Sequence, residues 1–149
     1  MQWQLQLNWC WAAGAASVAD YFGTAGPSGV IWQQCEIVNA ELLQGSCCVD
    51  GRTTACNRGW YFDRALRRVG HLAGLPTGPA LFAEVAVEID GDRPVGARIE
   101  FAGDDGHAVI ISGYHDAGDG FFDIEDSFWG PATYDYETFR TNYCLRAGV

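Results

Sequence analysis

The sequence predicts an α+β fold in which a helical N-terminal half packs on a C-terminal antiparallel β-sheet. Apolar residues recur at helical spacing up to Pro94, and beyond it apolar and polar residues alternate. The 149 residues are enough for one domain around a single core. We therefore expect a single domain over 1–149, with a mainly helical half at 1–93 and a mainly β half at 94–149.

Four helices are expected in the first half. The first is rich in alanine and nearly apolar on all sides, so it should be central and buried. Asn8 is a suitable N-cap for this helix, and Gly23 is a suitable stop. The expected helices cover 9–22, 31–43, 59–69 and 80–89.

The second half alternates apolar and polar residues with a period of two, which is typical of half-buried strands. Clusters of Gly and Asp separate the alternating segments and predict turns. The expected strands cover 95–101, 108–114, 121–126 and 133–136.

The composition excludes two classes of partner. The formal net charge of −10 argues against nucleic acid, whose recognition needs a basic patch. No apolar stretch approaches the roughly 18 residues that cross a bilayer, so no membrane span is expected. Six cysteines in so short a chain favour a secreted protein. No apolar signal segment is visible, so we expect that an export signal was removed or lies outside this chain.

Three residues can form an arrangement of nucleophile, base and orienting group. Cys10 lies at the start of the buried helix, where free N–H groups favour the thiolate, the nucleophilic form of cysteine. His107 opens one strand and Asp126 ends the next, so adjacent antiparallel strands can bring the two together. Each residue alone has a purely structural reading: Cys10 and His107 as core residues, Asp126 as a strand-end cap.

An oxyanion hole can be assembled from the segment before Cys10. Gln4 precedes Cys10 by six residues, close enough for its side-chain amide and the backbone N–H of Cys10 to point to the same place. Gln6 is the competing candidate. The tryptophans are expected in the core and the cleft wall: Trp3, Trp9, Trp11, Trp32 and Trp60.

His115 is the alternative base. It lies near three aspartates, Asp116, Asp119 and Asp123, whose spacing does not match an EF-hand loop. We interpret this segment as a solvated turn. No metal site and no other cofactor are predicted.

Seven motifs follow one another along almost the whole chain: QLQLNWCWAA (4–13), QQCEIVNA (33–40), CC (47–48), CNRG (56–59), DGDRPV (90–95), GDDGHAVIISGY (103–114) and IEDSFWG (124–130). Together they resemble the papain-like cysteine proteases, in particular the small bacterial secreted and effector branch with a Trp-Cys-Trp-Ala-Ala core. The resemblance implies a papain-like fold, with Cys10 as nucleophile, His107 as base, Asp126 as orienting residue and Gln4 as oxyanion donor.

The resemblance also bears on two tryptophans and on Asp126. Trp129 resembles the tryptophan that shields the histidine in this family, and we expect Trp11 at the cleft. Asp126 stands where the family more often has Asn. We expect Asp126→Asn to keep more than about a tenth of the activity, because the orienting residue of an imidazolium needs only to accept one hydrogen bond.

Four cysteines cluster in the helical half: Cys35, Cys47, Cys48 and Cys56. We expect two disulfides and prefer Cys35–Cys47 with Cys48–Cys56 over the crossed pairing, since a vicinal Cys47–Cys48 bridge is strained. A structural zinc site is the alternative. Cys144 is expected to be unpaired and buried.

These features predict a secreted cysteine endopeptidase that hydrolyses peptide bonds through an acyl-enzyme intermediate. Its substrate would be a protein or peptide, and an inhibitory pro-segment or inhibitor protein outside this chain is a candidate partner. Two alternatives remain open. One is a cell-wall amidase or acyl transferase with the same triad, and the other is a catalytically silent binding module of the same fold.

Overall fold

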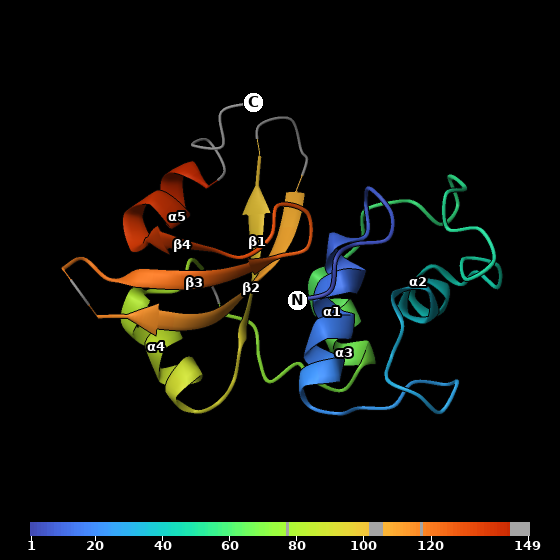
Figure 1. Cartoon of the computed structure of the whole chain (residues 1–149), viewed down its shortest axis with the longest axis horizontal. Helices are drawn as coiled ribbons and strands as arrows, with labels where there is room; N and C mark the ends of the chain where they lie inside the picture. The colour runs from blue at the N-terminus through green and yellow to red at the C-terminus, as the bar shows by residue number, and fades with distance from the viewer. Residues whose placement is uncertain (77, 102–105, 117, 144–149) are drawn as a thin grey trace.

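The computed structural model describes residues 1–76, 78–101, 106–116 and 118–143 (Figure 1). Within these ranges it contains five helices and one four-stranded sheet, which confirms the α+β prediction. No helix in the described part of the chain is both long and apolar enough to cross a membrane. The helices are α1 (Cys10–Tyr21), α2 (Gln34–Leu42), α3 (Phe62–Arg68), α4 (Phe82–Asp90) and α5 (Tyr136–Asn142).

The sheet is antiparallel throughout, with the strands in the order β1-β2-β3-β4. Figure 1 shows α1, α2 and α3 on one side of the molecule, and the sheet with α4 and α5 on the other. The strand bounds agree with the sequence prediction to within two residues. They are β1 (Val95–Glu100), β2 (Gly106–His115), β3 (Phe121–Asp126) and β4 (Ala132–Asp135).

The core consists of two apolar clusters, and β2 contributes to both because its side chains alternate between the faces of the sheet. Ala108 and Ile110 pack with α1, α2 and α3. Val109 and Ile111 pack with residues of α4 and α5. The second strand therefore connects the helical half to the rest of the molecule.

Helix α1 is buried as predicted, and five of its alanines are fully inaccessible to solvent. A Cβ atom at Gly14 would lie 2.8 Å from the ring of Phe62, so glycine permits the close approach of α3. Asn8 does not cap the helix. Its side chain donates to the backbone carbonyl of Asn57 at 3.1 Å, and Trp9 occupies the cap position with no side-chain cap bond.

Helix α5 is absent from the sequence prediction. Asp135 caps it by accepting a hydrogen bond from the backbone N–H of Thr138 at 2.9 Å. Tyr136, Phe139 and Tyr143 follow one another at helical spacing and join the cluster beneath the sheet. This spacing is a helix signal that the period-two reading of 133–136 obscured.

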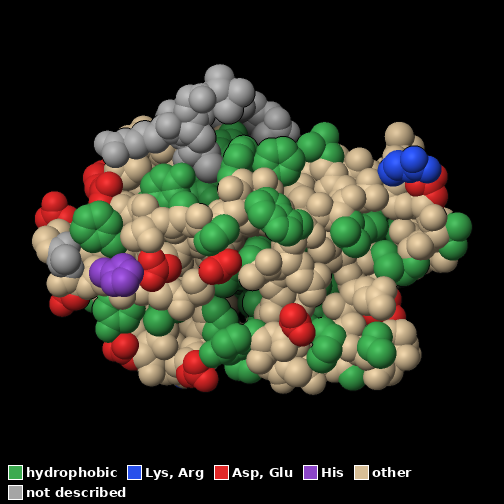
Figure 2. Space-filling model, viewed as in Figure 1, with side chains coloured by type: hydrophobic (Ala, Val, Ile, Leu, Met, Phe, Trp, Pro, Cys, Tyr) green, Lys and Arg blue, Asp and Glu red, His purple; other side chains and the backbone are tan. Residues whose placement is uncertain are grey.

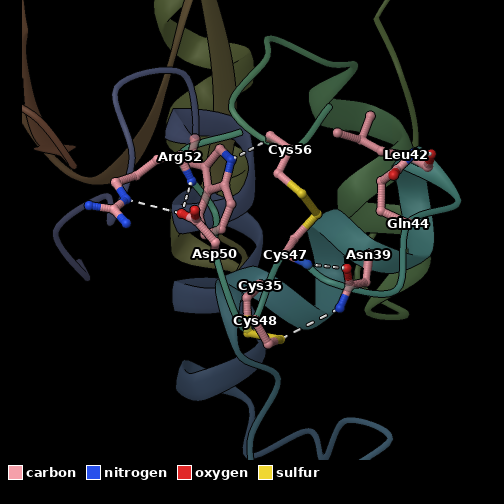
Figure 3. The surroundings of a disulfide bond; sticks show 10 residues. Cys35, Asn39, Leu42, Gln44, Cys47, Cys48, Asp50, Arg52 and Cys56 are labelled. Carbon is pink, nitrogen blue, oxygen red and sulfur yellow. Dashed lines mark hydrogen bonds and ion pairs between the residues drawn. A yellow bond between two sulfur atoms is a disulfide. The ribbon is translucent and has the colours of Figure 1, made fainter. Parts of the chain in front are cut away.

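The predicted number of disulfides is confirmed, but the preferred pairing is wrong. The structure has the crossed pairing, Cys35–Cys48 and Cys47–Cys56 (Figure 3). The adjacent residues Cys47 and Cys48 differ sharply in exposure: Cys47 is buried with Cys56, whereas Cys48 is exposed and bonds to Cys35 in the first turn of α2. Because all four sulfurs are in disulfides, the zinc alternative is excluded.

Asn39 fixes the loop between the two disulfides. Its side-chain oxygen accepts from the backbone N–H of Cys47 at 2.9 Å, and its amide nitrogen lies 3.6 Å from the sulfur of Cys48 (Figure 3). One side chain thereby contacts both cysteines, Cys47 at its backbone and Cys48 at its sulfur. The prediction for Cys144 concerns a residue outside the described ranges.

Candidate active site

The structure brings together the three residues that the sequence proposed as nucleophile, base and orienting group. Cys10 is the first residue of α1, His107 lies at the start of β2, and Asp126 is the last residue of β3. His107 Nε2 donates to Asp126 Oδ2 at 2.9 Å, and Cys10 lies close enough to the ring to raise the pKa of His107. Since Nε2 is engaged by Asp126, Nδ1 is the ring nitrogen left to face the thiol.

The surroundings of His107 favour its charged form. Burial of the ring lowers its pKa, but the hydrogen bonds and charges of Asp126 and Cys10 raise it by more, to about 9. The imidazolium is therefore the stable form at neutral pH. All three side chains are largely shielded from water, with residue exposures of 9% for Cys10, 7% for His107 and 3% for Asp126.

The carboxylate of Asp126 accepts four hydrogen bonds. The backbone N–H groups of Phe128 and Trp129 donate to Oδ1 at 2.7 and 3.0 Å. The hydroxyl of Tyr143 and the ring of His107 donate to Oδ2. Burial raises the pKa of Asp126, but these donors outweigh it and hold the pKa below its usual value.

Trp129 covers the histidine. Its ring lies edge-on to that of His107 with centroids 5.0 Å apart, and its backbone N–H binds Asp126. Trp11 has a different place from the one expected, because it is 1% exposed and its indole N–H donates to the carbonyl of Arg58 at 3.1 Å. As the second residue of α1, Trp11 packs in the core and does not line a cleft.

Gln4 joins the end of β3 to the turn that leads into α1. Its backbone N–H donates to the carbonyl of Ser127 at 3.0 Å, and its side-chain oxygen accepts from the Ser127 hydroxyl at 2.9 Å. Its amide nitrogen donates to the carbonyls of Gln6 and Leu7. The side chain of Gln6 lies against Gly51, where a Cβ atom would be 3.2 Å from it.

Gln34 is a site residue that the sequence analysis did not identify. Its side chain is buried at the start of α2, accepts from the backbone N–H of Leu5 at 3.0 Å and donates to the carbonyl of Trp3 at 2.8 Å. The amide thus pairs with the N-terminal segment as a neighbouring strand would. The only signal was its place in the motif QQCEIVNA, to which no role was given.

The alternative base lies elsewhere. His115 is at the other end of β2 from His107, is largely exposed, and pairs with Asp123 at 3.0 Å. In the part of the chain that the structure describes, no group of three or more His, Cys, Asp or Glu side chains is placed to hold a metal ion.

The family model of the Peptidase_C39 like family matches residues 1–148. The chain therefore belongs to this family, which supports a cysteine peptidase. No curated protein and no solved structure matches the chain.

Proposed function

We propose that this member of the Peptidase_C39 like family is a papain-like cysteine endopeptidase that works through an acyl-enzyme intermediate. One observation carries the proposal: Cys10 begins a buried helix close enough to His107 to raise its pKa, and the Nε2 atom of that histidine is held by Asp126. Attack by a cysteine requires the thiolate, so the proposed reactive state pairs the thiolate of Cys10 with the imidazolium of His107.

In the first half of the reaction, the sulfur of Cys10 attacks the carbonyl carbon of the scissile bond. The carbonyl oxygen becomes an oxyanion, for which the backbone N–H of Cys10 and the amide of Gln4 are the proposed donors. For Gln4 to donate, its amide must first release the carbonyl of Gln6 or that of Leu7. His107 transfers its Nδ1 proton to the leaving nitrogen, the C–N bond breaks, and a thioester remains on Cys10.

In the second half, neutral His107 takes a proton from water while the water oxygen attacks the thioester. The C–S bond breaks, the carboxylic acid product leaves, and the thiolate and imidazolium are restored. Asp126 accepts the Nε2–H bond throughout, so the ring keeps Nδ1 toward the sulfur.

The setting of the site is also part of the proposal. Residues 1–149 are proposed to act as one catalytic domain on protein or peptide substrates. The two disulfides support a secreted protein, because such bonds persist in oxidising compartments.

The proposal is tested by treating the wild type and Cys10→Ala with a thiol-reactive peptidyl inhibitor and measuring intact mass. We expect one inhibitor on the wild type, none on the variant, and peptide hydrolysis by the wild type only. Substantial hydrolysis by Cys10→Ala would remove Cys10 as nucleophile. Turnover of purified peptidoglycan in place of peptides would assign the site to an amidase, and an unreactive Cys10 would indicate a binding module.

A further inference from the structure

The N-terminal segment has its polar side chains toward the protein and its large apolar side chains toward solvent. Gln2, Gln4 and Gln6 are half-buried, whereas Trp3, Leu5 and Leu7 are 62%, 65% and 68% exposed. Trp3 was predicted to lie in the core or the cleft wall, and the structure instead places it at the surface. A group of exposed large apolar residues indicates a binding surface, since monomeric proteins seldom leave one uncovered.

The exposed side chain of Trp3 lies beside the loop that follows β3. A Cβ atom at Gly130 would be 3.2 Å from the Trp3 ring, and the rings of Phe128 and Trp129 are 5.0 Å apart. Phe128 and Trp129 are each 46% exposed. We call Trp3, Phe128 and Trp129 the aromatic rim. Figure 2 shows apolar side chains at the surface where Figure 1 places these two segments.

The aromatic rim is held in place by polar contacts beneath it. Gln34 binds the carbonyl of Trp3 and the N–H of Leu5, and Gln4 binds Ser127 through its backbone and its side chain. The N–H groups of Phe128 and Trp129 are bound by Asp126. Both segments are thus fixed by partly buried hydrogen bonds, and the aromatic side chains stay at the surface.

We infer that the aromatic rim binds large apolar side chains of the substrate on the C-terminal side of the scissile bond. The inference rests on the proposed function. His107 must lie next to the leaving nitrogen in order to protonate it, so the residues that follow this nitrogen pass His107. The ring that covers His107 is Trp129, and Phe128 contacts Trp129. The substrate class is therefore a peptide with an apolar residue within the first few positions after the cleaved bond.

The test uses two synthetic fluorogenic peptides that differ only in the three residues after the scissile bond, Leu-Phe-Leu in one and Ser-Ser-Ser in the other. We expect the wild type to cleave the apolar peptide with a kcat/KM at least about tenfold higher, as a well-filled apolar subsite gives. Trp3→Ala and Phe128→Ala should each reduce this ratio several-fold. Leu75→Ala, which removes an equally exposed leucine between α3 and α4, should leave both rates unchanged.

A ratio near one in the wild type, or an equal fall for both peptides in Trp3→Ala, would overturn the inference. So would a wild-type dimer that becomes monomeric in Trp3→Ala, because the occupant would then be a second copy of the chain. Binding of uncleaved peptides to Cys10→Ala separates this inference from the proposed function. Tighter binding of the apolar peptide that Trp3→Ala abolishes supports the aromatic rim even if the wild type cleaves neither peptide.

Discussion

Tyr143 and His107 donate hydrogen bonds to the same carboxylate oxygen, Oδ2 of Asp126. Tyr143 directly follows α5, is buried, and packs against Phe139 and Tyr134. The end of the described chain thus contacts the residue that orients the proposed base. Two backbone N–H groups donate to the other oxygen, Oδ1. Each oxygen of this carboxylate therefore accepts two hydrogen bonds from residues that the structure describes.

The four donors to Asp126 change the expectation for Asp126→Asn. An Asn side chain has one oxygen and one NH2 group, and the NH2 must face either the backbone N–H groups of Phe128 and Trp129 or the ring of His107. In the first orientation, the NH2 group faces backbone N–H groups, which can only donate. In the second orientation, it faces Nε2 of His107, which could accept its hydrogen bond only after losing its own proton. We now expect a loss in kcat/KM of at least about 10²-fold, against the smaller loss that the sequence suggested.

Asp123→Asn is the matched control, because Asp123 also pairs with a histidine of β2 but is part of an exposed pair. It should leave kcat/KM within about twofold of the wild type, in line with the small value of surface ion pairs. If Asp126→Asn kept most of its activity, one accepted hydrogen bond would suffice for orientation.

Removal of the Tyr143 hydroxyl should change the pH profile. The alkaline limb of kcat/KM reports loss of the proton from His107, whose pKa is raised to about 9. Without the tyrosine, Oδ2 accepts more strongly from the imidazolium and favours its charged form. We expect Tyr143→Phe to move the alkaline limb to higher pH by roughly half a unit.

The control for Tyr143→Phe is Tyr114→Phe, which removes a hydroxyl that donates to Asp90 on the surface. Its pH profile should match that of the wild type. A lower melting temperature of Tyr143→Phe with an unmoved alkaline limb would assign Tyr143 a packing role only.

Substitutions around Gln4 separate oxyanion stabilisation from anchoring. Gln4→Ala removes the proposed donor and should slow acylation by roughly 10²-fold. Ser127→Ala removes only the hydroxyl that binds the Gln4 side-chain oxygen and should cost less than about tenfold. Gln6→Ala, whose side chain lies against Gly51, should have little effect on acylation. Single-turnover acylation rates provide the comparison, and equal losses in Gln4→Ala and Ser127→Ala would show that Gln4 acts as an anchor.

The two disulfides should differ in their effect on the site. The carbonyl of Cys56 accepts from the indole of Trp9 at 2.8 Å, and Trp9 precedes Cys10. Cys47→Ser/Cys56→Ser should therefore lower both activity and the free energy of unfolding, the latter by a few kcal/mol. Cys35→Ser/Cys48→Ser should affect mainly stability. Denaturant unfolding and kcat/KM test this, and equal activity in both double variants would contradict it.

Local patterns predicted the elements that carry the proposed triad. The alanine-rich apolar run identified α1, and the period of two located β2 and β3, whose ends place His107 beside Asp126. Antiparallel pairing of successive strands is a local rule, so these two residues could be brought together without knowledge of the whole fold.

The contacts that the sequence did not predict depend on the whole fold. Gln34 reaches the backbone at Leu5 and Trp3 across 29 and 31 residues, and no local pattern encodes such a pairing. The disulfide pairing depends on which way Cys47 and Cys48 face in an irregular loop. Tyr143 was missed because α5 was not predicted.

The burial of the Cys47–Cys56 bond means that reducing agents should act on this chain in two opposing ways. Cys10 must stay a thiol, whereas the bond beneath Trp9 must stay oxidised. Because Cys48 is exposed, a thiol can attack the outer disulfide, Cys35–Cys48, directly. The inner disulfide, Cys47–Cys56, is reached only when the loop opens. Activity as a function of thiol concentration should therefore rise, hold through loss of the outer bond, and fall once the inner bond is broken.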